Sequence, residues 1–150
     1  MTPLDAALAG ATRVGLDTGP LIYFVETHPD FRFVPRELIR RAGIGQMKLV
    51  TSMITLTEVL VQPLRHGSQT LIDEYRDILL NSGEIEVLGV DAAIAETAAR
   101  LRATYRSLRT PDAIQLATAI ERSCGAFITN DKRLQQVAEV NVLYLQDLTA

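Results

Sequence analysis

Four carboxylates have positions in the chain that could serve one shared chemistry. Asp17, Glu58, Asp112 and Asp131 each fall after an apolar run or in the first turn of an expected helix. Carboxylate oxygens are hard ligands that suit Mg²⁺ or Mn²⁺ better than zinc. Several of them held close together repel one another and raise each other's pKa values unless a cation is bound. If the fold gathers them, the sequence predicts a divalent-metal site suited to phosphodiester hydrolysis.

Each of these acids also has an ordinary structural explanation. Asp17 and Asp131 could be turn residues. Glu58 follows Thr55 with the spacing of a capping box, and Asp112 would lie at the favourable, positive end of a helix dipole. Taken singly, these explanations suffice. The metal site is favoured over these separate explanations because all four acids lie where one sheet edge could bring them together.

The expected elements would bring the four acids to one edge of a sheet. Apolar runs predict strands that end at Asp17 and that cover residues 48–53, 85–90, 125–129 and 141–145. Helices are expected after Asp17 and over residues 33–41, 54–67, 71–80, 92–105, 110–120 and 132–138. This alternation predicts an α/β fold with a parallel sheet and helices on both faces. Because parallel strands end at the same edge, acids that follow them collect there.

Some helix ends carry specific signals. The Thr55 and Glu58 pair predicts the start of one helix, which Pro63 and Gly67 are expected to end. Asp91 is expected to cap the helix over 92–105. Thr110 is expected to be the N-cap of the next helix, with Pro111 as its first residue and Asp112 in its first turn.

Composition narrows the class of protein. A length of 150 residues predicts a single domain over residues 1–150, with residues 1–12 as an Ala-rich N-terminal extension. The net charge of −3 gives no global basic footprint for nucleic acid, so any such contact must be local. One cysteine, Cys124, allows neither a disulfide framework nor a cysteine zinc site within one chain. No signal-peptide pattern and no apolar run long enough to span a bilayer is seen, so we expect a soluble, cytoplasmic protein without membrane contact.

Four short motifs together resemble a known family. They are Leu16-Asp17-Thr18, Glu58 within Ile-Thr-Leu-Thr-Glu-Val, Thr110-Pro-Asp-Ala-Ile-Gln-Leu-Ala-Thr-Ala, and Thr129-Asn130-Asp131. In order and spacing they resemble the PIN-domain ribonucleases, most of all the VapC-type toxins of bacterial toxin–antitoxin pairs. The resemblance covers roughly residues 13–146. It implies a Rossmann-like three-layer α/β/α sandwich around a five-stranded parallel sheet of order 3-2-1-4-5.

The resemblance also implies a function and its residues. It implies an endoribonuclease that depends on Mg²⁺ or Mn²⁺, is frequently a homodimer, and has a small antitoxin partner that covers the site. The acidic cluster and metal ligands would be Asp17, Glu58, Asp112 and Asp131, with the Thr129 hydroxyl beside them. Arg106, Arg109, Lys132 and Arg133 flank the acids in sequence and are candidates to contact RNA phosphates.

The chain departs from the family pattern at several points. Gly19 stands where many members have Asn or Ser, so a polar contact near the site is expected to be missing. Leu134 stands where an aromatic residue is often found. The N-terminal extension is longer than in minimal toxins.

Two other functions are compatible with acids gathered at a sheet edge. One is a non-catalytic PIN-like module that binds RNA or a protein partner. The other is a phosphoacceptor signalling domain, which also gathers acids at a sheet edge but places a lysine directly after its last strand. No lysine follows Leu145 here. No Ser/His/Asp constellation and no phosphate-binding P-loop motif is present, and His28 and His66 lack ligand spacing.

Overall fold

The centre of the fold is a parallel sheet of five strands in the order β3-β2-β1-β4-β5. The computed structural model describes residues 1–148. The strands are β1 (Arg13–Leu16), β2 (Lys48–Ser52), β3 (Ile85–Leu88), β4 (Ala126–Thr129) and β5 (Val142–Tyr144). Every neighbouring pair is parallel. The expected α/β class and the 3-2-1-4-5 order are both confirmed. The order also differs from the 2-1-3-4-5 order of phosphoacceptor domains.

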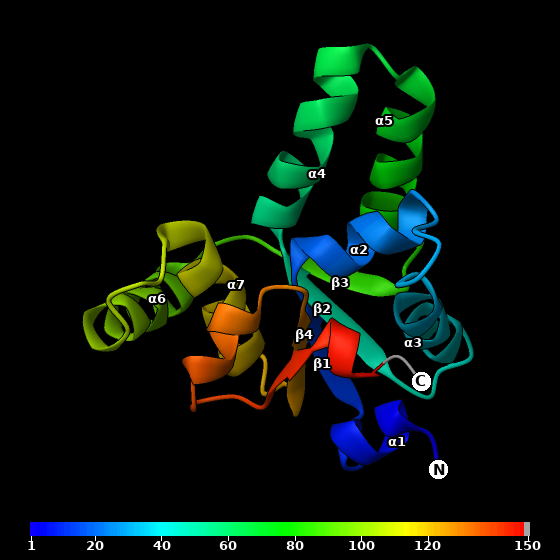
Figure 1. The fold of residues 1–150 in the computed structure, drawn as a ribbon. Helices are drawn as coiled ribbons and strands as arrows, with labels where there is room; N and C mark the ends of the chain where they lie inside the picture. Colours follow the sequence, from blue (N-terminus) through cyan, green and yellow to red (C-terminus); the bar gives the residue numbers. More distant parts are fainter. Residues whose placement is uncertain (149–150) are drawn as a thin grey trace.

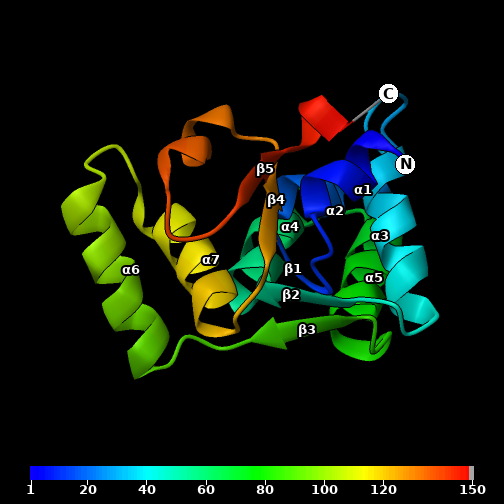
Figure 2. The same ribbon diagram turned by 90° about the horizontal axis from the view of Figure 1, so that it is seen from below.

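Helices cover both faces of this sheet and make three layers (Figures 1 and 2). One face carries α6 (Ala92–Thr104) and α7 (Thr110–Glu121), which lie together on one side of the strands in Figure 2. The other face carries α2 (Thr18–Val25), α3 (Phe33–Gly43), α4 (Met53–His66) and α5 (Gln69–Arg76), the last continuing as a π-helical turn η1 (Asp77–Asn81). The 3-10 turns η2 (Lys132–Gln136) and η3 (Leu145–Leu148) flank β5.

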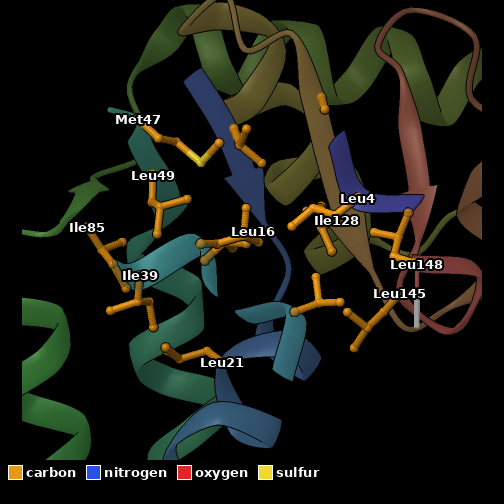
Figure 3. Close-up of a cluster of buried hydrophobic side chains, with 14 of the residues drawn as sticks. Leu4, Leu16, Leu21, Ile39, Met47, Leu49, Ile85, Ile128, Leu145 and Leu148 are labelled. Atoms are coloured by element: carbon orange, nitrogen blue, oxygen red, sulfur yellow. The ribbon is translucent and has the colours of Figure 1, made fainter. Parts of the chain in front are cut away.

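Two hydrophobic cores hold the layers together. The larger one joins strand residues such as Leu16, Leu49 and Ile128 to Leu21 of α2 and Ile39 of α3 (Figure 3). The α1 helix (Pro3–Leu8) adds Leu4 and Leu8 to this core, so the N-terminal extension is packed rather than loose.

The second core lies under α6 and α7, where small residues allow close packing. Ala113, Ala117 and Ala119 of α7 are almost fully buried. A Cβ at Gly15 of β1 would lie 2.8 Å from the Cβ of Ala119, closer than real contacts allow. Glycine at position 15 therefore lets the C-terminal half of α7 approach the central strand closely.

The structure corrects the expected start of α4 and confirms that Gly67 ends it. The N-cap is Ser52, whose Oγ accepts a hydrogen bond from the Ile54 amide at 3.1 Å. Thr55 and Glu58 do not form the capping box, because both already lie inside the helix and Thr55 is fully buried in side-chain contacts. Pro63 does not end the helix either, which continues to His66 and stops at Gly67 with φ of 66°.

Other boundaries also differ from the sequence-based expectation. Arg109, not Thr110, occupies the N-cap of α7, and the Thr110 hydroxyl instead accepts a hydrogen bond from Arg102 Nη1. The helix expected over 132–138 is only the short 3-10 turn η2. The expected Asp91 cap of α6 is confirmed, with its Oδ1 2.9 Å from the Ile94 amide nitrogen. None of the helices within residues 1–148 is long and apolar enough to cross a membrane.

Candidate metal centre

Asp17 lies at the junction of β1 and α2, at the carboxyl end of the sheet. Its backbone amide still belongs to the sheet, since it donates to the Ile128 carbonyl of β4 at 2.9 Å. Its side chain has two partners: Oδ1 accepts from the Thr18 amide and Oδ2 from the Thr129 hydroxyl, both at 2.8 Å. Main chain and side chain therefore hold this carboxylate in one orientation.

Thr129 connects two of the four acids. Its side chain is fully buried at the end of β4. The hydroxyl that donates to Asp17 also accepts a hydrogen bond from the Asp131 amide at 3.0 Å. The expected hydroxyl beside the acids is thus found in contact with an acid, and it also positions the loop that carries Asp131.

Glu58 reaches the same edge from α4. Its Oε1 accepts a hydrogen bond from the Thr18 hydroxyl at 2.7 Å, so it is linked to the residue directly after Asp17. The side chain is otherwise exposed. Glu58 therefore has free acceptor capacity toward solvent.

Asp112 has a buried carboxylate oxygen without a hydrogen bond from the described residues. The residue lies in the first turn of α7, and its side chain is 17% exposed. The unpartnered oxygen is Oδ2. The nearest cationic atoms, Nε of Arg109 and Nη2 of Arg133, are 3.8 and 3.9 Å away, too far for a hydrogen bond. A buried carboxylate oxygen without a protein partner is costly, and a bound cation or water molecule would satisfy it.

The acids differ in their electrostatic environment. Burial, assisted by the negative charges of Asp112 and Glu58, raises the pKa of Asp17 to about 6, against the lowering effect of its hydrogen bonds from Thr129 and Thr18. The Arg133 guanidinium lowers the pKa of Asp131 below its usual range. The charged form of Asp17 is thus disfavoured, whereas that of Asp131 is stabilised by its pair with Arg133.

The acids can be compared with the geometry of a closed metal site. Within residues 1–148 no three carboxylate, histidine or cysteine side chains converge closely enough to form a preformed metal cage. The negative charges of Asp112 and Glu58 nevertheless help to raise the pKa of Asp17, and the oxygen-only donor set suits Mg²⁺ or Mn²⁺. The unpartnered Oδ2 of Asp112 and the raised pKa of Asp17 both fit a bound cation.

A buried polar network lies beneath the acids, and the sequence did not reveal it. Gln115 is 2% exposed, and its Nε2 donates to the Thr55 hydroxyl at 2.6 Å and to the Thr18 hydroxyl at 3.3 Å. Thr51 bonds to Thr55 at 2.8 Å and donates to the Leu16 carbonyl at 2.9 Å. The one available signal was a polar residue three positions after Asp112 in an otherwise apolar helix interior.

The departure at Gly19 has a structural counterpart in Asn130. A Cβ at residue 19 would lie 1.8 Å from Oδ1 of Asn130, so the Asn130 side chain occupies the space that a side chain at position 19 would need. The Asn130 amide donates to the Tyr23 hydroxyl at 3.1 Å. The loop after β4 therefore places a polar side chain over Gly19 at the start of α2.

The four basic candidates have different surroundings. Arg109 and Arg133 lie beside Asp112, and Arg133 also pairs with Asp131. Arg106 and Lys132 are exposed and form no ion pair with any residue between 1 and 148. Only two of the four are therefore placed directly at the acids.

A groove of about 660 Å³ lies elsewhere on the surface, lined by residues of α2, α3, α5 and η1. Its lining includes the apolar Phe24, Val25 and Ile78 and the charged Arg32 and Arg36. None of the four acids lines it. We therefore place the candidate chemistry at the sheet edge and not in this groove.

Comparison with solved structures supports the fold. VapBC2 from Rickettsia felis, bound to a DNA fragment from its promoter, matches with a TM-score of 0.69 and 18% identity over 88% of this chain and 98% of that chain. A toxin–antitoxin complex from Klebsiella pneumoniae matches with a TM-score of 0.67 and 22% identity over 89% and 97%. DNA-bound VapBC from Salmonella typhimurium matches with a TM-score of 0.61 and 15% identity over 89% and 98%.

Sequence comparison is more specific about the family. None of the curated proteins matches the chain in sequence. The family model of the PIN domain, however, matches residues 14–140, a span that begins in β1 and contains all four acids. The strand order, the position of the acids at the carboxyl edge and this match agree, and the chain belongs to the PIN domain family.

Proposed function

We propose that the protein is an endoribonuclease that requires Mg²⁺ or Mn²⁺, with its active site at the carboxyl edge of the sheet. PIN domains as a family are nucleases. Two observations together carry the proposal. Oδ2 of Asp112 is buried and accepts no hydrogen bond from the described residues, and the pKa of Asp17 is raised to about 6 in part by the charge of Asp112. This arrangement is unfavourable for the metal-free protein and becomes favourable once a cation is bound.

We assign the acids two different roles. Asp17 and Asp112 would hold the ion directly, and Glu58 and Asp131 would hold a second ion or orient a water molecule. Thr129 and the Thr18 amide fix the orientation of the Asp17 carboxylate. When bound, the metal lowers the pKa of a water molecule and stabilises the charge that develops on the phosphate oxygens.

The substrate would approach beside Arg109, which is 75% exposed and lies 3.8 Å from Asp112. The exposed Arg106 and Lys132 flank the acids in sequence, in the loop before α7 and at the start of η2, and could extend this contact. Basic side chains around an acidic centre attract the phosphate backbone without reading its bases. We therefore expect affinity for RNA to fall steeply with salt.

The direct test is cleavage of a fluorescent single-stranded RNA with added Mg²⁺ or Mn²⁺ or with EDTA. The Asp17→Asn variant, purified in the same way, controls for contaminating ribonuclease. We expect cleavage that requires metal, is lost in EDTA, and falls by orders of magnitude in the variant. Undiminished cleavage in excess chelator would refute the proposal. RNA binding without cleavage under all conditions would favour the non-catalytic module, and cleavage of single-stranded DNA instead of RNA would reject the substrate assignment.

We propose further that the protein is the toxin of a toxin–antitoxin pair, acting in the cytoplasm on cellular RNA. The support is the likeness in fold to proteins solved as toxin–antitoxin complexes. A small reading frame beside the gene, encoding a DNA-binding pattern, would identify the antitoxin partner. Growth arrest on expression that co-expression of this neighbour relieves would support the assignment, and unaffected growth would contradict it.

Two structural proposals accompany this function. We propose that residues 1–150 form one PIN domain with residues 1–12 as its extension, in keeping with the packing of Leu4 and Leu8 into the main core. We also propose a symmetric homodimer, on the family resemblance alone. Light scattering at micromolar concentration should report twice the mass of 16.5 kDa, and a monomer mass would contradict it.

A further inference from the structure

Arg133 holds the carboxylate of Asp131 as a two-pronged ion pair. Its Nε donates to Asp131 Oδ1 at 3.1 Å, and its Nη2 donates to Oδ2 at 2.6 Å. The Arg133 backbone amide also donates to Oδ1 at 3.1 Å. Both oxygens of one proposed metal ligand are therefore already engaged by a cation of the same chain.

The same guanidinium faces a second acid of the site. Nη2 of Arg133 is 2.6 Å from Asp131 Oδ2 and 3.9 Å from Asp112 Oδ2, the buried oxygen without a hydrogen bond. A positively charged group thus lies between two carboxylates that come from different elements, α7 and the loop before η2. The guanidinium therefore supplies positive charge to both carboxylates.

The pair is open to solvent. The Arg133 side chain is 51% exposed, and its distance to Asp112 is too long for a hydrogen bond. The forked geometry makes the pair with Asp131 stronger than a typical surface ion pair, but water can solvate the guanidinium once it leaves. A divalent ion, by contrast, brings twice the charge and would be repelled by a guanidinium that stayed.

We infer that Arg133 is a positioning residue that acts as an internal counter-cation of the acidic site and competes with the divalent ion for Asp131. In the metal-free protein it holds Asp131 toward Asp112 and offsets part of their repulsion. Metal binding through Asp131 then requires the guanidinium to move out. This inference rests on the metal site of the proposed function, and it assigns Arg133 a role toward the acids and not, in the free protein, toward RNA.

The test compares Mn²⁺ affinity between two variants that lose the same charge. Arg133→Gln removes the counter-cation. Arg122→Gln is the matched control, because Arg122 forms an equally forked, half-exposed pair with Glu86, at 2.6–2.9 Å, on a different part of the surface. Free Mn²⁺ is measured by electron paramagnetic resonance, without RNA. We expect the Kd for Mn²⁺ to fall about three- to tenfold in Arg133→Gln and to stay unchanged in Arg122→Gln.

A second measurement follows the guanidinium itself. In an NMR titration of the unmodified protein with Mg²⁺, the side-chain Nε–H resonance of Arg133 should shift. Its proton should also exchange faster with water as the pair with Asp131 opens. The Nε–H signal of Arg122 should stay unchanged and serves as the control within the same sample.

The outcomes separate this inference from the proposed function. Equal or weaker Mn²⁺ binding by Arg133→Gln, or an Arg133 signal that does not respond to saturating Mg²⁺, overturns the competition while leaving the metal site intact. If neither the unmodified protein nor Arg133→Gln binds Mn²⁺, the metal site fails and this inference with it.

Discussion

Replacing Asp17 by Asn should make the metal-free protein more stable at neutral pH. The pKa of Asp17 is raised from 3.8 to about 6, chiefly by burial and then by Asp112 and Glu58. The folded protein therefore binds a proton at this site more tightly than the unfolded chain does. The charge penalty is small below pH 4, grows as the pH rises through the window from about 4 to 6, and is fully present above it.

The size of this effect follows from the pKa shift. At about 1.4 kcal/mol per pKa unit, a rise from 3.8 to about 6 corresponds to roughly 3 kcal/mol. Because Asp17 is only partly buried by its accessible surface, solvent screening reduces this to about 1–2 kcal/mol. Asn can keep the bond from the Thr18 amide and can donate to Thr129, so little hydrogen bonding is lost. For a chain of this length the melting temperature should rise by about 2–8 °C.

The assay is urea unfolding in EDTA from pH 4 to pH 8. Asp17→Asn should match the unmodified protein near pH 4 and exceed its stability above pH 6. Glu96→Gln is the control, since Glu96 is exposed on α6 and forms no hydrogen bond with any residue of the described span. A variant that is less stable than the unmodified protein by the same amount at every pH would show that Asp17 is only a structural cap and would refute the reasoning.

Three further changes test the neighbouring residues. Asp112→Asn should hold or raise the melting temperature in EDTA and lose most of the Mn²⁺ shift seen for the unmodified protein; retention of the full shift with lower stability in EDTA would contradict the metal site. Gln115→Leu should lower the free energy of unfolding by about 1–3 kcal/mol, because buried threonine hydroxyls lose their partner, and should weaken Mn²⁺ binding; unchanged binding would limit the network to a structural role. Gly19→Ala should impair cleavage by displacing Asn130, and the loss should vanish in an Asn130→Ala background; an equal loss in both backgrounds would disprove the coupling.

The sheet and most helices could be predicted because their signals are local. Apolar runs marked the strands, and alternation with helices required a parallel sheet. The strand order came from the family resemblance and not from the runs themselves. Helix starts were less certain, because two residues can offer the same cap. Ser52 and Thr55 both have suitable hydroxyls, and only the burial of Thr55 among Thr51, Thr18 and Gln115 decides that Ser52 is the cap.

The positions of the acids in the fold could be predicted, but their surroundings could not. Asp17 and Asp131 come after strands, Asp112 lies in the first turn of a helix, and Glu58 lies in the second turn of another, so each position follows from the local sequence. The Gln115 network joins residues far apart in the chain, and no pattern within one segment encodes it. The role of Arg133 is equally invisible, because a basic residue beside an acid in sequence can face either the acid or solvent.

Gly19 and Asn130 show why a missing motif residue is not a missing function. From the sequence, glycine at position 19 suggested the loss of a polar contact beside Asp17. In the fold, the loop after β4 returns to the start of α2, and Asn130 fills the space that glycine leaves open. The two residues depend on each other, since any side chain at position 19 would collide with Asn130 in its observed position. The loop after β4 thus supplies a polar side chain over the start of α2, and the packing of this edge, more than the residue at one motif position, decides which segment supplies it.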